Sequence, residues 1–210
     1  MKIIFDLDGT LICSKKRLHR LFLDLTKVND FEFNTYWNLK HQGKKNEDIL
    51  RDNLGFSELE IKNFLKNWMI MIETDYYLDM DSLIPNAEKA LENLNENHDL
   101  FICTARQSIL QTQKQLKKLS IFNYFKDIFI TEQKAHKFNV LSSSNFTFTR
   151  KDWFVGDTGH DINAGKKIGV QTCAVLSGFM SKKFLISYSP DLIIKDFTYL
   201  DASQMLTLQP

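Results

Sequence analysis

The sequence predicts an α/β fold: a doubly wound, mostly parallel sheet with an inserted all-helical cap domain. Two observations predict it. Short apolar runs, rich in β-branched residues, alternate with helical periodicity over most of the chain. One stretch, from about residue 14 to residue 83, lacks such runs and shows amphipathic helical patterns alone. A chain of 210 residues is long enough for a full domain with a sizeable insertion.

The predicted strands are the short apolar runs that end in turns or loops. The first covers residues 3–5 and leads into Asp6-Leu7-Asp8-Gly9-Thr10. Later strands are expected at residues 100–103, 128–131, 153–155, 172–176 and 192–194. Helices are expected between most of them, including residues 87–94 and 109–119. Because strand and helix alternate, the sheet should be mostly parallel, with helices on both faces.

The inserted stretch is expected to form a separate helical cap. Its clearest helix opens at Ser57, where Glu60 completes a capping box. The apolar face of this helix is predicted to hold Leu59, Phe64, Leu65, Trp68, Met69 and Ile72. The chain should return to the sheet through a helix with Pro85 in its first turn. The predicted domains are therefore residues 1–13 and 84–210 for the core and 14–83 for the cap.

Composition and charge argue against several classes of protein. Lys and Arg total 27 against 26 Asp and Glu, so no net charge favours nucleic acid or a membrane surface. No run of 18 apolar residues suggests a membrane span, and Asp6 comes too early for a signal peptide. The cysteines, Cys13, Cys103 and Cys173, form no metal or disulfide pattern. We expect a cytoplasmic protein without nucleic-acid or membrane partners; its oligomeric state stays open.

Polar side chains follow four of the predicted strands, at the point where each strand ends. They are Asp6 and Asp8, then Thr104 and Arg106, then Lys134 and Lys137, and finally Asp157 and Asp161. The carboxyl ends of parallel strands meet at one edge of the sheet, and ligands bind there near the topological switch point. The sequence therefore predicts one site that combines acids, a hydroxyl group and a lysine.

Such a set of groups suits phosphoryl transfer. Asp6 and Asp157 offer hard carboxylate oxygens, which suit Mg²⁺. The ion would cancel the repulsion between a carboxylate nucleophile and an anionic phosphate. A carboxylate is a known nucleophile for this chemistry and gives an aspartyl phosphate. Asp8 could exchange the proton of the leaving oxygen and of water, while Thr104 and a lysine bind the phosphoryl oxygens.

Four motifs in this order resemble those of the haloacid dehalogenase superfamily. They are Asp6-Leu7-Asp8-Gly9-Thr10, Thr104, a lysine ahead of a helix, and Gly156-Asp157-Thr158-Gly159-His160-Asp161. Residues 85–104, 161–170 and 190–194 resemble the phosphoglycolate-phosphatase-like subgroup. The likeness covers almost the whole core, whereas the insertion matches in position and character. The chain departs from the pattern at Asn86 and near His98, where glycine is usual.

The resemblance implies a Rossmann-like core, a Mg²⁺ cofactor and a small phosphorylated metabolite as substrate. Asp6 would be the nucleophile and a metal ligand, and Asp8 the general acid/base, with its carbonyl on the ion. Thr104, the lysine and backbone N–H groups near Leu7, Asp8 and Ala105 would hold the phosphoryl group. Asp157 would complete the metal site, with Asp161 as a ligand or in contact with the ligands. An acid at Asp8 is typical of phosphatases and phosphomutases.

Several assignments stay open at this level. Lys137, four residues before Leu141, has the spacing expected just ahead of a helix, whereas Lys134 suits a longer loop; Lys137 is favoured. Arg106 fits a substrate contact or a surface salt bridge equally well. His160 is interpreted as a loop residue. The cluster Lys15-Lys16-Arg17 is interpreted as a solvated helix start.

The cap supplies one further hypothesis. In similar enzymes, the turn between the first cap helices faces the active site, so Lys40, Lys44 or Lys45 could contact an anionic substrate. The alternative is that all three are ordinary surface lysines.

Three functions are weighed. The favoured one is a phosphatase, the second an intramolecular phosphomutase of the β-phosphoglucomutase type, and the third a non-catalytic binding protein that keeps the fold. A calcium loop is excluded, because Leu11 and Arg17 stand where its glycine and glutamate must be.

Overall fold

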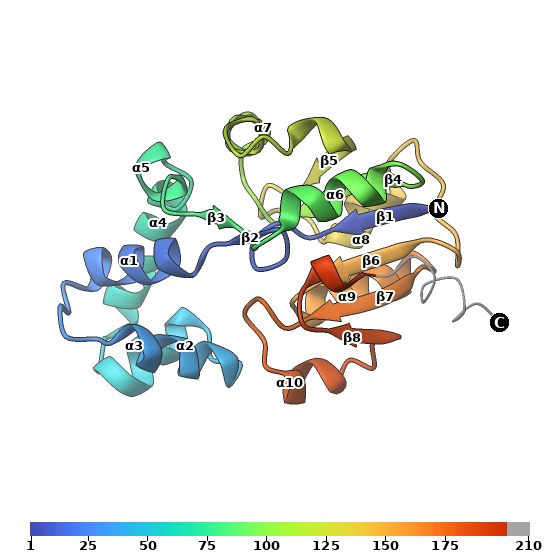
Figure 1. The fold of residues 1–210 in the computed structure, drawn as a ribbon. Coiled ribbons are helices and arrows are strands. Elements are labelled where there is room, and N and C mark those ends of the chain that lie inside the picture. The colour runs from blue at the N-terminus through green and yellow to red at the C-terminus, as the bar shows by residue number, and fades with distance from the viewer. Residues whose placement is uncertain (201–210) are drawn as a thin grey trace.

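The main sheet is built around β1 (Lys2–Phe5). In this computed structural model, which describes residues 1–200, six parallel strands lie in the order β5-β4-β1-β6-β7-β8 (Figure 1). The other strands are β4 (Asp99–Thr104), β5 (Phe125–Ile130), β6 (Trp153–Gly156), β7 (Gln171–Val175) and β8 (Leu192–Ile194). The predicted α/β fold is confirmed. Residues 201–210, assigned to the core from sequence, lie outside the described residues.

The ends of the strands differ from prediction mainly at the sheet edge. β5 begins at Phe125 rather than at residue 128, and it includes the exposed residues Lys126 and Asp127. An edge strand has a neighbour on one side only, so polar residues are common in it and its apolar pattern is weak. Lys126 also forms an ion pair of 2.7 Å with Asp99 on the neighbouring strand.

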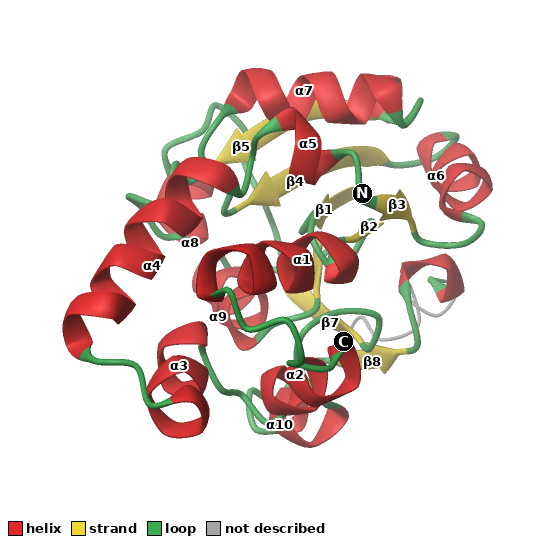
Figure 2. Cartoon of the chain, turned by 90° about the vertical axis from the view of Figure 1, so that its left-hand side faces the viewer, coloured by secondary structure: helices red, strands yellow, loops and turns green. Residues whose placement is uncertain are grey.

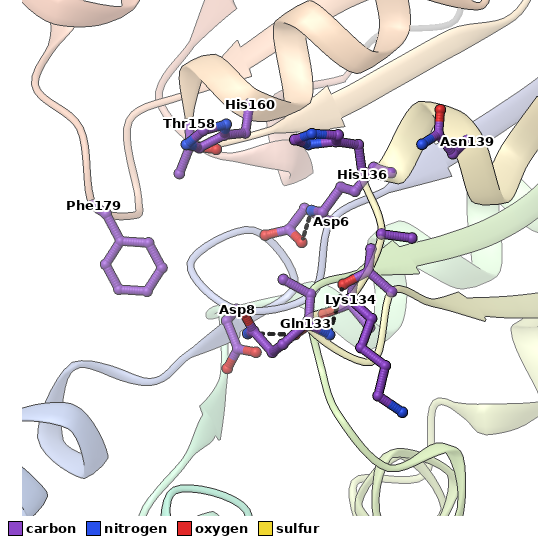
Figure 3. Close-up of a pocket in the computed structure, with 14 residues that line it drawn as sticks. Asp6, Asp8, Gln133, Lys134, His136, Asn139, Thr158, His160 and Phe179 are labelled. Atoms are coloured by element: carbon purple, nitrogen blue, oxygen red, sulfur yellow. Dashed lines mark hydrogen bonds and ion pairs between the residues drawn. The ribbon is translucent and has the colours of Figure 1, made fainter. Parts of the chain in front are cut away.

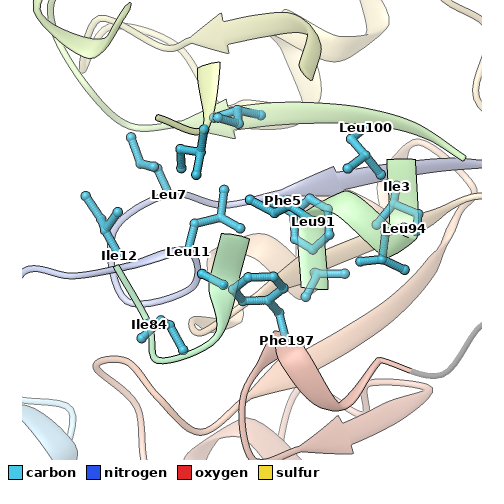
Figure 4. Packing of buried hydrophobic residues seen from close by; sticks show 14 of the residues in the cluster. Ile3, Phe5, Leu7, Leu11, Ile12, Ile84, Leu91, Leu94, Leu100 and Phe197 are labelled. Carbon is cyan, nitrogen blue, oxygen red and sulfur yellow. The ribbon is translucent and has the colours of Figure 1, made fainter. Parts of the chain in front are cut away.

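Helices cover both faces of the sheet, as predicted. On one face, α6 (Ala87–Asn95) and the 3₁₀ helix η2 (Phe197–Tyr199) pack against Ile3 and Phe5 (Figure 4). Leu116 of α7 (Ile109–Lys118) belongs to the same core. On the other face, α8 (Lys137–Ser142) and α9 (Gly159–Lys167) pack against Ile4. Next to α9 lies α10 (Lys182–Ile186), and η1 (Phe122–Tyr124) precedes β5. Alternate residues of β1 thus fill two cores.

Residue Pro85 lies outside the helix in which it was expected. α6 begins at Ala87, after Asn86 in the left-handed conformation with φ of 65°. Glycine and asparagine are the residues that tolerate this conformation best, which explains why asparagine can stand where glycine is usual.

Beside the core lies the cap, which we define as helices α1–α5 of residues 15–78 (Figure 2). Its helices are α1 (Lys15–Thr26), α2 (Phe33–His41), α3 (Asn46–Leu54), α4 (Glu58–Met71) and α5 (Asp75–Leu78). Two short antiparallel strands, β2 (Ile12–Cys13) and β3 (Ser82–Leu83), join it to the core. Both strands were missed, since two residues are too short for a recognisable pattern.

The cap has an apolar core of its own, which includes Phe22, Tyr36, Trp37 and Phe64. The capping box of Ser57 and Glu60 at the start of α4 is confirmed. Leu59, however, is 69% exposed, so its assignment to the apolar face was wrong. The buried stripe begins at Ile61 and continues three, four and seven residues later, and Leu59 falls outside that spacing.

The sequence led us to expect no disulfide pattern among the cysteines and no membrane-spanning segment. All three cysteines are free thiols, and Cys103 and Cys173 are buried. Within residues 1–200, no helix combines the length and apolar character needed to cross a membrane.

Candidate active site

The four polar strand ends meet in one pocket of about 540 Å³ at the carboxyl edge of the sheet (Figure 3). Asp6 and Asp8 follow β1, and Thr104 and Ala105 lie at the end of β4. The remaining walls come from residues 131–139 ahead of and within α8, from the start of α9, and from Phe179 after β7. The pocket therefore contains residues from strands that lie far apart in the sequence.

Three buried carboxylates form the deepest part of the site. Oxygens of Asp6, Asp157 and Asp161 lie within 4.8 Å of one another, the one such acidic cluster among the described residues. The ammonium group of Lys137 contacts Oδ1 of Asp6 and lies 2.6 Å from Oδ1 of Asp161. Three ionised carboxylates facing one lysine would carry two excess negative charges, which is the charge that one divalent cation neutralises.

Local structure orients each carboxylate. Oδ2 of Asp161 accepts hydrogen bonds from the backbone N–H (3.0 Å) and the hydroxyl (2.7 Å) of Thr158, in the capping box of α9. Its other oxygen is therefore left for Lys137. Oδ2 of Asp157 accepts the backbone N–H of Phe179 at 2.6 Å. Oδ1 of Asp157 is buried and accepts no hydrogen bond from the described part of the chain.

A glycine allows this close packing. Gly9 has φ of +88°, and a Cβ atom at this position would lie 2.5 Å from Oδ2 of Asp157. A side chain here would be strained by the backbone conformation and would also displace the carboxylate.

Burial and mutual repulsion control protonation of the acids. Burial raises the pKa of Asp6 to about 7; Asp161 adds to the rise, and Lys137 opposes it. Burial, together with the charges of Asp6 and Asp161, raises the pKa of Asp157 well above its ordinary value. Burial alone would lower the pKa of Lys137, but Asp161 and Asp6 outweigh it and raise that pKa. The ammonium group of Lys137 therefore stays protonated, whereas a further cation would stabilise the ionised forms of the acids.

The donor set fits Mg²⁺. This ion prefers hard oxygen ligands and takes one or two protein carboxylates together with water and phosphate oxygens. The buried Oδ1 of Asp157 has no protein partner among residues 1–200, and it belongs to the cluster that carries the excess negative charge. A cation ligated there would satisfy both the unpaired oxygen and the charge.

Asp8 lies at the side of the pocket nearest the cap. Its Oδ2 accepts Nε of Arg106 at 2.6 Å, and its Oδ1 accepts Nη2 of Arg106 at 2.9 Å. Nη2 of Arg17 also donates to Oδ1. Burial alone would raise the pKa of Asp8, but Arg106 and Arg17 outweigh it and hold that pKa below its ordinary value.

Arg106 differs from expectation. It is 3% exposed, so the surface salt bridge is wrong. Arg106 does not line the main pocket either, so the pocket does not support the alternative, a substrate contact. Arg106 pairs instead with Asp8, whose side chain is 19% exposed, and its buried guanidinium group also donates to Gln115 of α7 at 3.0 Å.

The two candidate lysines occupy different environments. Lys137 begins α8 and reaches the acids from that helix start. The side chain of Lys134 is 79% exposed and pairs with Glu132 at 2.8 Å, so it lies at the outer rim of the pocket.

The cap lysines do not line the pocket. Nζ of Lys40 donates to Oδ1 of Asn46 at 3.4 Å, and burial lowers the pKa of Lys40 to about 8. Lys44 pairs with Asp52 at 3.0 Å, and Lys45 flanks the start of α3. The expectation that this turn presents its lysines to the site is therefore not met; the turn instead brings Gly43 against Phe184 of α10.

Sequence reasoning missed several residues of the site. Arg17 was expected to be solvated, yet it is 2% exposed and bound to Asp8. A signal was present, since Arg17 lies four residues before the buried Leu21 on the same face of α1. Phe179 and His136 line the pocket from loops, where no periodicity marks them. His160, interpreted as a loop residue, lies in the first turn of α9 and lines it too.

Comparison with known proteins agrees with this geometry. The family model described as haloacid dehalogenase-like hydrolase matches residues 3–175. The pyrophosphatase PpaX of Oceanobacillus iheyensis is 27% identical over 92% of this chain and 92% of its own.

Solved structures show the same fold. A haloacid dehalogenase-like family hydrolase from Streptococcus pneumoniae has a TM-score of 0.77 at 24% identity and covers 99% of this chain and 98% of its own. A predicted phosphoglycolate phosphatase from Haemophilus somnus has a TM-score of 0.69 at 21% identity, and the match covers 93% of this chain and 94% of its own. YfnB from Bacillus subtilis, bound to magnesium, has a TM-score of 0.61 at 19% identity, and the match covers 93% of this chain and 94% of its own.

Proposed function

We propose that this chain, which belongs to the haloacid dehalogenase-like hydrolase family, is a magnesium-dependent phosphatase with Asp6 as its nucleophile. Its substrate is a small phosphorylated metabolite. The observation that carries the proposal is the contact of Asp6 with Lys137 beside Asp157 and Asp161, at the base of a pocket of about 540 Å³. These groups combine a nucleophile, a phosphate-binding cation and a set of hard oxygen ligands.

The phosphoryl group binds above Asp6. Lys137 provides a fixed positive charge for its oxygens, and Thr104 with the backbone at Ala105 provides hydrogen-bond donors. These donors act where negative charge is spread over the oxygens of the transition state. Because Lys137 is held by two acids, its ammonium group is already in place before the substrate arrives.

Asp6, Asp157 and the backbone carbonyl of Asp8 would hold Mg²⁺, with Asp161 as a ligand or in contact with the ligands. The bound ion supplies Lewis-acid polarisation and cancels the repulsion between carboxylate and phosphate. The unpaired Oδ1 of Asp157 supports this assignment, as does the relative YfnB, whose structure contains magnesium.

The reaction has two halves. In the first, a carboxylate oxygen of Asp6 bonds to phosphorus and the bond to the leaving oxygen breaks. Asp8, which the two arginines keep ionised in the free protein, takes a proton from the bound phosphate monoanion and passes it to that oxygen. In the second, Asp8 takes a proton from water as the water oxygen attacks phosphorus, which frees phosphate and restores Asp6. Asp8 lines the same pocket as Asp6, so both halves take place in one site.

Pyrophosphate belongs among the first substrates to be tested, because PpaX, which is 27% identical, is named a pyrophosphatase. The near balance of positive and negative residues supports a small metabolite rather than nucleic acid or a membrane surface. The free thiols support a cytoplasmic location.

The test uses purified protein and p-nitrophenyl phosphate, with and without Mg²⁺. The wild type should release phosphate only when Mg²⁺ is present. The activity of Asp6→Asn should be lower by at least about 10³-fold, because an amide is not a nucleophile. Asp127→Asn, a change on the exposed edge strand, is the matched control. Activity retained by Asp6→Asn would refute the assignment.

A further inference from the structure

Four charged residues lie where the cap joins the core, and we call them the hinge cluster: Asp8, Arg17, Asp81 and Arg106. Asp8 and Arg106 belong to the core. Arg17 lies in the first turn of α1, and Asp81 lies in the linker between α5 and β3. The first turn of the cap and the linker that returns the chain to the core thus contribute one residue each. Arg17, Asp81 and Arg106 are buried, whereas the side chain of Asp8 is 19% exposed where it lines the pocket.

Asp81 holds both arginines in place. Its Oδ1 lies 3.1 Å from Nε of Arg17, and its Oδ2 lies 3.5 Å from Nη2 of Arg106. Gln115 of α7 donates to Oδ2 of Asp81 at 2.8 Å and to the carbonyl of Leu78 at 3.0 Å. Arg17 also donates to the carbonyl of Ile72 at the end of α4, at 3.2 Å. The guanidinium groups are therefore fixed by partners other than Asp8.

The arginines decide which part of Asp8 is free. An ionised carboxylate has about four acceptor positions, two on each oxygen. Oδ1 accepts from Arg17 and from Nη2 of Arg106, so both of its positions are used. Oδ2 accepts from Nε of Arg106, which leaves one position on that oxygen. Without Arg17, Oδ1 would have a free position too, and the carboxylate could present either oxygen.

We propose that Arg17 is a positioning residue for Asp8, which presents Oδ2 alone for proton exchange with the leaving oxygen and with water. This inference rests on the proposed function, in which Asp8 is the general acid/base. Because Arg17 belongs to α1, Asp8 has its full set of donors while the cap lies against the core.

The experiment compares two esters with different leaving groups, phenyl phosphate and p-nitrophenyl phosphate, in Mg²⁺. Phenolate is a basic leaving group, with a pKa of about 10 like the tyrosine side chain, and needs a well-placed proton donor. Nitrophenolate is less basic and depends less on a donor. The ratio of kcat/KM for the two esters therefore reports the alignment of Asp8, whereas a general loss of folded protein lowers both values equally.

The main variant is the double substitution Arg17→Met with Asp81→Asn. It removes one positive and one negative group, so no unpaired charge is left in the interior. We expect kcat/KM to fall on the order of 10²-fold for phenyl phosphate and less than about 10-fold for p-nitrophenyl phosphate. Arg17→Lys, which keeps the charge but not the planar fork, should give an intermediate ratio. Arg20→Met removes an exposed arginine from the same helix and should leave the ratio unchanged.

The variant Asp8→Asn sets the upper limit of the effect. In this background the double substitution should cause no further change in the ratio, because the group that Arg17 positions is gone. Equal losses on both esters, or a further change in the Asp8→Asn background, would overturn the inference while leaving the proposed function intact. A wild type inactive on both esters would overturn the proposed function, and this inference with it.

Discussion

The backbone N–H of Phe179 donates a hydrogen bond of 2.6 Å to Oδ2 of Asp157. The ring of Phe179 stacks on Trp37 of α2, with centroids 5.6 Å apart and planes at 19°. One loop residue after β7 thus contacts a proposed metal ligand with its backbone and the cap with its side chain. The two contacts use different atoms, so substitutions can separate them.

Replacing Phe179 by alanine should weaken cap closure without loosening the metal site. The stacking contact stabilises by about 0.5–1.5 kcal/mol beyond the buried area. We expect KM to rise several-fold, whereas Mg²⁺ affinity by calorimetry should stay within about twofold, because the backbone N–H is retained. Tyr199→Ala, which removes an exposed ring of η2 in the core, is the control. A loss of Mg²⁺ affinity in Phe179→Ala would contradict this separation.

Replacing Asp157 by asparagine should stabilise the metal-free protein and abolish its response to Mg²⁺. The substitution removes one charge from a buried cluster with excess negative charge, and an amide oxygen can still accept the N–H of Phe179. A gain of about 1 kcal/mol would raise Tm by about 2–4 °C for a chain of this size. Thermal melts with and without Mg²⁺ measure both effects. A lower Tm in the metal-free variant would show that other interactions of Asp157 outweigh its repulsion from the neighbouring acids.

The affinity for Mg²⁺ should rise with pH over the range below about pH 7. Below this value the carboxyl group of Asp6, whose pKa burial raises to about 7, holds a proton that the ion must displace. One displaced proton changes the affinity by about tenfold for each pH unit. Calorimetry at several pH values, in buffers of different ionisation enthalpy, counts the protons released. The range from about pH 5.5 to about pH 7 lies just below the raised pKa of Asp6. A Mg²⁺ affinity that stays constant over this range would refute the prediction.

The metal-free protein should lose stability as pH rises from about 4 to about 7. The folded state binds more protons than the unfolded state in this window, because the pKa of Asp6 is raised from 3.8 to about 7. Stability then falls with pH, by the sign of the linkage relation. Urea unfolding across this range measures the slope, and saturating Mg²⁺ should reduce or reverse it. A rising slope without metal would contradict the direction of the shift.

Replacing Lys137 by methionine should lower phosphatase activity by about 10²–10³-fold, because the variant loses a charge aimed at the phosphoryl oxygens. Lys134→Met, three residues away in the same segment, should stay within about twofold of the wild type, since its side chain is exposed at the rim. Steady-state rates of both variants, with circular dichroism to verify folding, give the comparison. Equal losses in the two variants would remove the distinction between these lysines.

The sequence by itself determined the architecture and the edge of the sheet where the site lies. Apolar runs and helical periods are local, and parallel strands expose their carboxyl ends together, so Asp6, Thr104 and Asp157 were expected near one another. The choice of Lys137 over Lys134 rested on helix spacing, and the contact with Asp6 supplies the geometric reason.

Only the tertiary structure decided which groups surround these residues. Arg17 meets Asp8 across a change of element, from α1 to the loop after β1. Asp81 meets Arg106, and Phe179 meets Asp157, from segments further away in the sequence. No local pattern records such pairings. The charge on Arg17 predicted exposure to solvent, whereas in the folded chain this side chain is buried against the carboxylates of Asp8 and Asp81. The pairing of buried charges is a property of the packed interior, because it depends on which partners folding brings within hydrogen-bond distance.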